Sequence, residues 1–156
     1  MANVQKITPF LWFDNCAEEA MNYYCEVFED SRIVHIERYP DESLDEHFVG
    51  MSGKVITGVF ELAGRQFMCL DGNADFKLNE AVSFFVSCKD QAEIDYFWSK
   101  LSHVPESEQC GWCKDKFGVS WQINPTDMGA YMTSPAAVQM MLQMKKIDIA
   151  ALQAAV

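Results

Sequence analysis

Few side chains of this 156-residue chain can do acid–base chemistry near neutral pH, because it holds only three histidines, His35, His47 and His103. His35 lies in a strand-like run, where it can face a cavity as base or ligand, or face solvent instead, which we favour because no partner is identifiable. His47 follows the acidic stretch 41–46, and His103 ends a predicted helix, where a cation is favourable. His35, His47 and Glu37 are the catalytic candidates, and none carries that role alone.

Cys110-Gly-Trp-Cys113 is the second chemical motif, because Cys-x-x-Cys pairs can be redox-active or hold half of a zinc site. A redox pair needs the start of a helix, whereas these cysteines fall in a strand-like stretch, where residues three apart point to opposite faces. No second Cys-x-x-Cys completes a zinc site. We therefore predict a structural role for the motif and reduced thiols throughout.

The charge balance limits the partners, because the charged side chains sum to −11. Nucleic acids and anionic membranes both need a basic surface, so neither is expected as a partner. No apolar run approaches the ~18 residues of a membrane span, and the N-terminus lacks the basic start of a signal peptide. The acidic stretch 41–46 lacks the spacing and the glycine of a calcium loop. We expect a cytoplasmic protein with a small-molecule or protein ligand.

The elements that must position these residues occur twice. Residues 7–13 predict a strand, and a helix capped by Asp14 or Asn15 follows. At an offset of 74 residues the pattern returns as a strand at 82–87 and a helix capped by Asp90. The repetition indicates two related modules.

Further strands complete each module. They are predicted at 32–39, 55–62 and 66–70, and again at 109–114 and 119–124. The chain is therefore expected to be a single α+β domain, 1–156, of two β-α-β-β-β modules, the second short of a strand or carrying it weakly. We place module one at 1–78, module two at 79–126 and a helical tail at 127–156. A methionine-rich helix starts the tail at Ser134-Pro135, and we expect it to pack on its own domain or on a dimer partner rather than to bind a peptide or ligand.

Four stretches, 10–28, 79–90, 109–124 and 144–154, resemble the vicinal-oxygen-chelate superfamily of glyoxalase I, the bleomycin and fosfomycin resistance proteins and extradiol dioxygenases. Within it they look like the PhnB-like branch, also labelled 3-demethylubiquinone-9 3-methyltransferase-like domain. The resemblance implies curved sheets that enclose a cavity, within one chain or across a homodimer. Metal-dependent members bind a divalent ion there through a His on the first strand and a Glu on the last strand of each module.

The metal-ligand positions implied by the resemblance hold other residues in this chain. The His positions fall at Ser83 and within 7–9, and the Glu positions fall at Gln122 and at Met68 or Cys69. Divalent ions prefer carboxylate, imidazole or thiolate, and Gln122 offers only a weak carbonyl ligand. We therefore expect no metal ion and no other cofactor.

The methyltransferase label can be tested against the glycines. A methyltransferase of the common class binds its cofactor at a glycine-rich turn, and the eight glycines of this chain contain no Gly-x-Gly. We treat the methyltransferase activity as the less favoured reading of the resemblance.

A pocket is expected where the strands point inward. Its predicted lining residues are Phe10, Trp12, Phe67, Ser83, Phe84, Trp121 and Gln122. Aromatic walls with a few polar groups suit a small organic ligand, and they also describe a packed core. We predict a homodimer that binds such a ligand without chemistry. The alternative is a lyase, isomerase or dioxygenase-like enzyme that uses the catalytic candidates.

Overall fold

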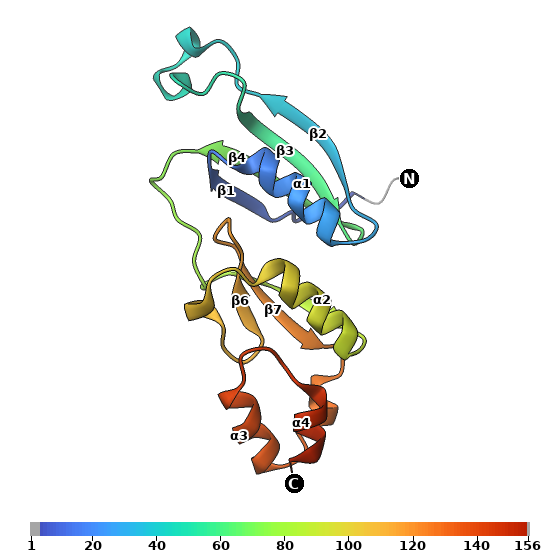
Figure 1. Ribbon diagram of the computed structural model, residues 1–156. Helices are drawn as coiled ribbons and strands as arrows, with labels where there is room; N and C mark the ends of the chain where they lie inside the picture. Colours follow the sequence, from blue (N-terminus) through green and yellow to red (C-terminus); the bar gives the residue numbers. More distant parts are fainter. Residues whose placement is uncertain (1–3, 156) are drawn as a thin grey trace. The chain divides into compact units, whose positions relative to one another are not determined.

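The computed structural model describes residues 4–155. The chain forms two compact units, Met1–Lys77 (the first unit) and Leu78–Val156 (the second unit). Each unit combines a sheet with helices, which confirms the predicted α+β class (Figure 1). None of the helices within residues 4–155 has both the length and the apolar character needed to cross a membrane.

The first unit is a sheet with one long helix against it. Its elements are β1 (Phe10–Asp14), α1 (Ala17–Val27), β2 (Arg32–Arg38), the short 3-10 helices η1 (Glu42–Leu44) and η2 (Glu46–Phe48), β3 (Val55–Leu62) and β4 (Arg65–Gly72). Within the described residues the strand order is β1-β4-β3-β2, with β1 parallel to β4 and the other neighbours antiparallel. Figure 1 shows α1 lying along one face of this sheet.

An apolar stripe holds α1 against the sheet. Ala20, Met21 and Tyr24 are at most 1% exposed, and their spacing places them on one side of the helix. Gly58 of β3 makes room for this stripe, because a Cβ at that position would lie 2.7 Å from the Met21 sulfur. Tyr24 stacks on Phe60 with ring centroids 6.4 Å apart. One face of the sheet is therefore closed by α1.

The start of α1 differs from the sequence prediction. We expected Asp14 or Asn15 as the cap, but Cys16 occupies that position and its side chain makes no capping hydrogen bond. The carboxylate of Asp71 in β4 instead accepts the N–H of Ala17 at 2.9 Å. A cap supplied by another strand leaves no signal in the local sequence, which is why the prediction was wrong.

The second unit repeats this arrangement with a smaller sheet. Its elements are β5 (Ser83–Cys88), α2 (Gln91–Leu101), the 3-10 helix η3 (Pro105–Ser107), β6 (Trp112–Lys114), β7 (Ser120–Pro125), the 3-10 helix η4 (Met128–Tyr131), α3 (Pro135–Gln143) and α4 (Ile149–Ala154). In the part of this unit that the structure describes, the strand order is β5-β7-β6, with β5 parallel to β7 and β6 antiparallel to β7. The prediction of a second module that lacks one strand is confirmed.

The helix α2 is positioned by the predicted cap at Asp90 and by buried apolar side chains. Asp90 caps it, because its side chain accepts the N–H of Glu93 at 2.9 Å. Ile94 and Leu101 are fully buried on the side that faces the sheet. The opposite face of this sheet is left free of α2.

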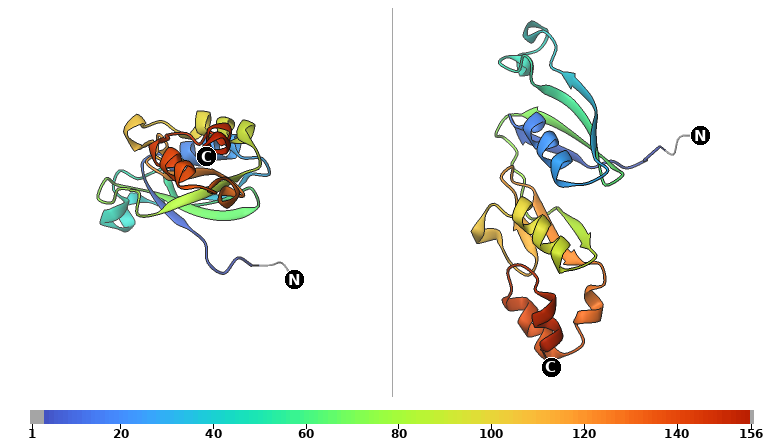
Figure 2. Two further views of the ribbon diagram at one scale, coloured as in Figure 1. Left: turned by 90° about the horizontal axis from the view of Figure 1, so that it is seen from below. Right: turned by 45° about the vertical axis from the view of Figure 1, so that its right-hand side comes forward.

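The C-terminal tail packs on the second unit itself. Gln91 holds it twice, since its side-chain nitrogen donates to the carbonyl of Ile147 at 2.9 Å and its oxygen accepts the N–H of Ile149 at 2.8 Å. Ser134, predicted as a helix start, caps α3, and Asp148 caps α4. Figure 2 shows α3 and α4 side by side at the C-terminal end of this unit.

Candidate functional site

In the first unit, the candidate site is the sheet face that α1 leaves uncovered, which we call the first open face. Side chains alternate between the two faces of a strand. Leu11 and Phe13 are buried under α1, so Phe10 and Trp12 lie on the other side, where Phe10 is 48% exposed. Strand register then defines the members of the first open face as Phe10, Trp12, Arg32, His35, Glu37, Thr57, Val59, Glu61, Gln66, Met68 and Leu70.

Trp12 is fixed on this face by its neighbours. Its indole N–H donates to the carbonyl of Asn73 at 2.8 Å, and its ring meets Phe76 edge-on at 4.9 Å between centroids. Gly72 lies beneath the ring, because a Cβ at that position would come within 2.1 Å of it. A glycine in β4 therefore allows the ring to lie flat across two strands and to form an aromatic floor beside Phe10.

Two of the catalytic candidates, His35 and Glu37, lie on the first open face. They occupy the edge strand β2, opposite Val59 and Thr57 of β3. An imidazole and a carboxylate on one side of one strand are within reach of a ligand on that face, so both can act on it as acid, base or hydrogen-bond partner.

The third candidate, His47, lies elsewhere, in the loop of η1 and η2. Its Nδ1 contacts the Asp45 carboxylate at 2.7 Å, and this contact raises the pKa of the His47 side chain. Asp41 and Asp45 cap the two short helices by accepting the N–H groups of Ser43 and His47. The acidic stretch thus caps the short helices of its own loop. His47 is 82% exposed in this loop.

Three predicted pocket residues lie on the helix-covered faces. In the first unit Phe67 stacks on Phe60 at 5.6 Å. In the second unit Phe84 contacts Trp121 at 5.6 Å, and the Trp121 indole N–H donates to the buried carboxylate of Asp115 at 2.8 Å. Phe67, Phe84 and Trp121 therefore sit on the opposite side of their strands from Trp12, Ser83 and Gln122.

The second unit has an equivalent surface, the second open face. Trp121 and Ile123 are buried on the side of α2, so Gln122 points the other way. It donates through its amide nitrogen to the hydroxyl of Ser83 at 2.9 Å, which places both on one face. Register gives the members of this face as Ser83, Phe85, Ser87, Trp112, Lys114, Ser120, Gln122 and Asn124.

The residues at the metal-ligand positions implied by the resemblance offer poor ligands for a divalent ion. The two positions of the second unit that the resemblance assigns to His and Glu, Ser83 and Gln122, are neutral and hydrogen-bonded to each other. In the first unit Met68 lies on the open face, while Cys69 is buried on the helix side, where burial and nearby Asp71 raise its pKa to about 12. No three His, Cys, Asp or Glu side chains within residues 4–155 come together as a metal site.

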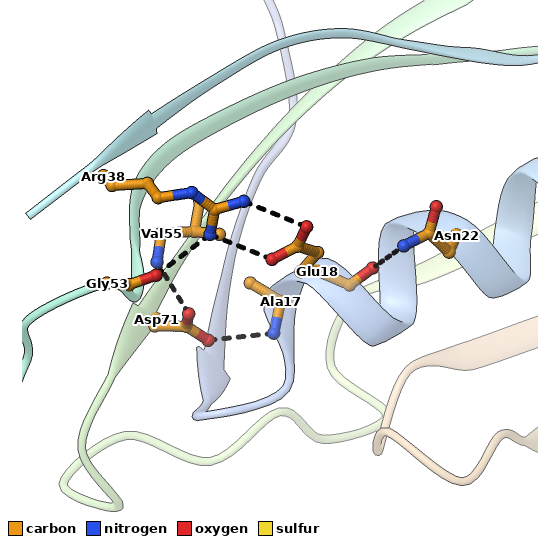
Figure 3. Close-up of polar contacts among 7 residues, drawn as sticks. All are labelled: Ala17, Glu18, Asn22, Arg38, Gly53, Val55 and Asp71. Atoms are coloured by element: carbon orange, nitrogen blue, oxygen red, sulfur yellow. Dashed lines mark hydrogen bonds and ion pairs between the residues drawn. The ribbon is translucent and has the colours of Figure 1, made fainter.

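A buried carboxylate that the sequence analysis missed organises the first unit. Asp71 is 5% exposed and accepts the N–H groups of Ala17 and Val55, each at 2.9 Å (Figure 3). Beside it, Arg38 donates to both carboxylate oxygens of Glu18 at 2.9 and 3.0 Å, which lowers the pKa of Glu18. Asp71 thus ties the start of α1 to β3 and β4. The signal available in the sequence was a single carboxylate in the otherwise apolar run of β4.

The Cys-x-x-Cys motif is split by a tight turn. Cys110 and Gly111 form the tip, with φ of 50° and 86°, between the bridged residues Gln109 and Trp112. Cys113 points into the core, where burial raises its pKa to about 12. The two N–H groups at the tip donate to carbonyls of the C-terminal tail, at 2.8 Å each. This geometry supports the predicted structural role.

Comparisons of the sequence and of the structure with known proteins indicate the same family. The sequence pattern of the family described as 3-demethylubiquinone-9 3-methyltransferase matches residues 5–124. A solved PhnB protein from Bacillus cereus is 43% identical, with a TM-score of 0.62, over 76% of this chain and 97% of its own. A Pseudomonas aeruginosa protein shares the fold at 16% identity, with a TM-score of 0.59, over 78% of this chain and 98% of its own. A search of curated proteins finds no significant match.

Proposed function

Since the chain belongs to the family described as 3-demethylubiquinone-9 3-methyltransferase and has its PhnB-like, glyoxalase-like fold, we propose that it binds a small organic molecule on the open faces of its sheets, without a divalent ion. The bound molecule contacts an aromatic floor and a few polar side chains. In this proposal the protein binds the molecule and catalyses no reaction.

The hydrogen bond from Gln122 to Ser83, 2.9 Å long, is the observation that carries this proposal. A hydroxyl and an amide that bind each other supply neither the charge nor the geometry that Mg²⁺, Zn²⁺ or a similar ion requires. The same pair suits an organic ligand, because its remaining donors and acceptors can orient a polar group.

The first open face, which belongs to the first unit, also supports the proposal. Phe10 and Trp12 present aromatic surface beside Met68, and Gly72 keeps the Trp12 ring in place. Aromatic and methionine side chains form adaptable apolar surfaces for small molecules. His35 and Glu37 supply polar contacts at the edge of this face.

Two measurements test the proposal. Elemental analysis of the purified protein should find no divalent ion at a stoichiometric level, and one ion per chain would contradict the metal-free proposal. A thermal-shift screen of small organic acids, amides and quinones should find stabilising compounds, since a ligand at 100 times its Kd adds about 2.7 kcal/mol.

Hits from the screen can be assigned to the open face with matched variants. Trp12→Leu should abolish the thermal shift of a compound that binds the first open face. Tyr96→Leu, which removes an exposed aromatic side chain from α2, should leave the shift unchanged. A screen with no hit, or equal effects of both variants, would count against the proposal.

A second candidate function is supported by the placement of His35 and Glu37 on one face. With a substrate on that face, one group can take a proton from carbon while the other returns it, which is the chemistry of an isomerase or lyase. Proton exchange between a bound candidate substrate and D₂O, lost in His35→Gln, would favour this enzyme. Tight binding of S-adenosylmethionine would instead favour a methyltransferase.

A further inference from the structure

The hydroxyl of Ser120 is buried without a partner on the second open face. Ser120 is 1% exposed. Among the buried side-chain oxygen and nitrogen atoms of the described residues, its hydroxyl oxygen is the one that makes no hydrogen bond. Folded proteins rarely leave such a group unsatisfied, because water would have bound it in the unfolded chain. An unpaired hydroxyl next to an exposed sheet face is therefore a reason to look for a missing acceptor or donor.

Ser120 lies in a row of donors that crosses the sheet. It is paired with Ser83 of β5 on one side and with Lys114 of β6 on the other. The Lys114 ammonium forms an ion pair with Glu80, just before β5, so its side chain extends from β6 toward the β5 side of the sheet. Lys114 and Ser120 are therefore neighbours on this face, and Glu80 holds the lysine ammonium at the same end of the sheet.

The row offers more hydrogens than acceptors. Ser83 already accepts from Gln122, so its own hydroxyl hydrogen remains to be donated. Ser120 has a hydroxyl hydrogen without an acceptor, and an ammonium carries three hydrogens, of which Glu80 needs one. A carboxylate, with two oxygens and about four lone-pair sites, matches this set of donors.

The next row along the strands is aromatic. Phe85 and Trp112 flank Gln122 from the two neighbouring strands, and Phe85 is 55% exposed. Rows on one face are about 6.6 Å apart along a strand. A ring seated between Phe85 and Trp112 therefore brings an attached carboxyl group to the row of Ser83, Ser120 and Lys114.

We propose that the second open face binds a planar aromatic carboxylic acid, with its ring between Phe85 and Trp112 and its carboxylate held by Lys114, Ser120 and Ser83. This inference rests on the proposed function and names the class of ligand for one of its surfaces. Glu80 is the competing anion, and its side chain is 55% exposed. The Lys114 side chain is 21% exposed. Because the Glu80 carboxylate is largely in solvent, the ion pair contributes little, and Lys114 can turn from Glu80 to the ligand.

The test uses benzoate as the probe, titrated into the full-length protein and followed by two-dimensional amide NMR. Benzoate should shift the amide signals of Ser83, Ser120 and Gln122 and the indole N–H signal of Trp112. Benzamide lacks the charge and cyclohexanecarboxylate lacks the flat ring, so both should bind at least about tenfold more weakly.

Matched variants assign the binding to this row. Lys114→Met should weaken benzoate binding by about tenfold or more, whereas Lys89→Met, which removes a 78%-exposed lysine of the same unit, should leave it unchanged. Ser120→Ala should weaken binding while leaving the fold intact, as judged by an unchanged amide spectrum away from the row. Equal binding of benzoate and benzamide, or an unaffected Lys114→Met variant, would overturn the proposal.

Failure of this inference can be told from failure of the proposed function. If indole shifts signals of the first open face while benzoate leaves Ser83, Ser120 and Gln122 unmoved, the aromatic-acid site is wrong and small-molecule binding stands. If neither probe nor any screened compound binds, both are wrong.

Discussion

At the scale of single residues, Asp71 and Ser120 are two buried polar groups with opposite energetics. Asp71 has a partner for each carboxylate oxygen, whereas the Ser120 hydroxyl has none. A satisfied buried carboxylate stabilises the fold through charge-assisted bonds, while an orphaned hydroxyl weakens it. The satisfied Asp71 is typical of a structural residue, and the unsatisfied Ser120 is typical of a residue that binds a ligand.

Replacing Asp71 by asparagine should destabilise the protein by about 2 kcal/mol, because one of two accepting oxygens becomes a donor that faces an N–H group. Urea unfolding measures this change. Asp148→Asn is the control, since within the described residues the Asp148 side chain accepts just the N–H of Ala151. Asparagine caps helices as well as aspartate does, so the effect should stay within about 0.5 kcal/mol. Equal effects of the two variants would refute the bridging role of Asp71.

Replacing Ser120 by alanine should stabilise the protein by about 1 kcal/mol, because it removes a buried hydroxyl that makes no hydrogen bond. Ser87→Ala, on the exposed part of the same face, should change the free energy of unfolding by less than about 0.5 kcal/mol. A destabilised Ser120→Ala variant would show that the hydroxyl has a partner and would remove the basis of the aromatic-acid site.

At the scale of elements, each sheet face owes its role to the helix beside it. Periodicity in the sequence predicted α1 and α2 and also predicted β3 at its observed bounds. It did not decide which face of each strand the helix would cover. Phe67, Phe84 and Trp121 were predicted to line the pocket. They lie on the opposite face of their strands, under the helices.

The packing of α1 on β3 depends on Gly58. Alanine there would place its Cβ 2.7 Å from the Met21 sulfur and 3.0 Å from that of Cys69, so Gly58→Ala should cost about 1–3 kcal/mol in thermal or urea unfolding. The cost should shrink when Met21→Ala is already present. Gly129→Ala, with no atom within 4 Å of the added Cβ, serves as the control and should be nearly neutral.

At the scale of the whole molecule, exposed aromatic residues on the open faces also favour self-association. Phe10 and Phe85 are 48% and 55% exposed, and solvent-exposed apolar patches commonly mark binding surfaces. We propose that the protein is a homodimer. The acidic charge of −11 sets a limit on this association, which should strengthen as salt screens the repulsion between copies.

Light scattering on a sizing column should give twice the 17.8 kDa of one chain. Phe10→Lys should shift the protein toward the monomer, whereas Tyr96→Lys on α2 should not. A monomeric wild type at all concentrations and salt levels would refute the homodimer.

The sequence by itself determined the repeat, the order of elements and the family, because periodicity, caps and turns act over a few residues and leave local patterns. It also named Ser83 and Gln122, which the tertiary structure joins by a hydrogen bond, and His35, which it places on an open face. Only the tertiary structure decided that Asp71 caps α1 and that Lys114 lies beside Ser120 and pairs with Glu80. Both depend on which strands become neighbours, and strand pairing joins residues far apart in the chain, where no local pattern records the contact.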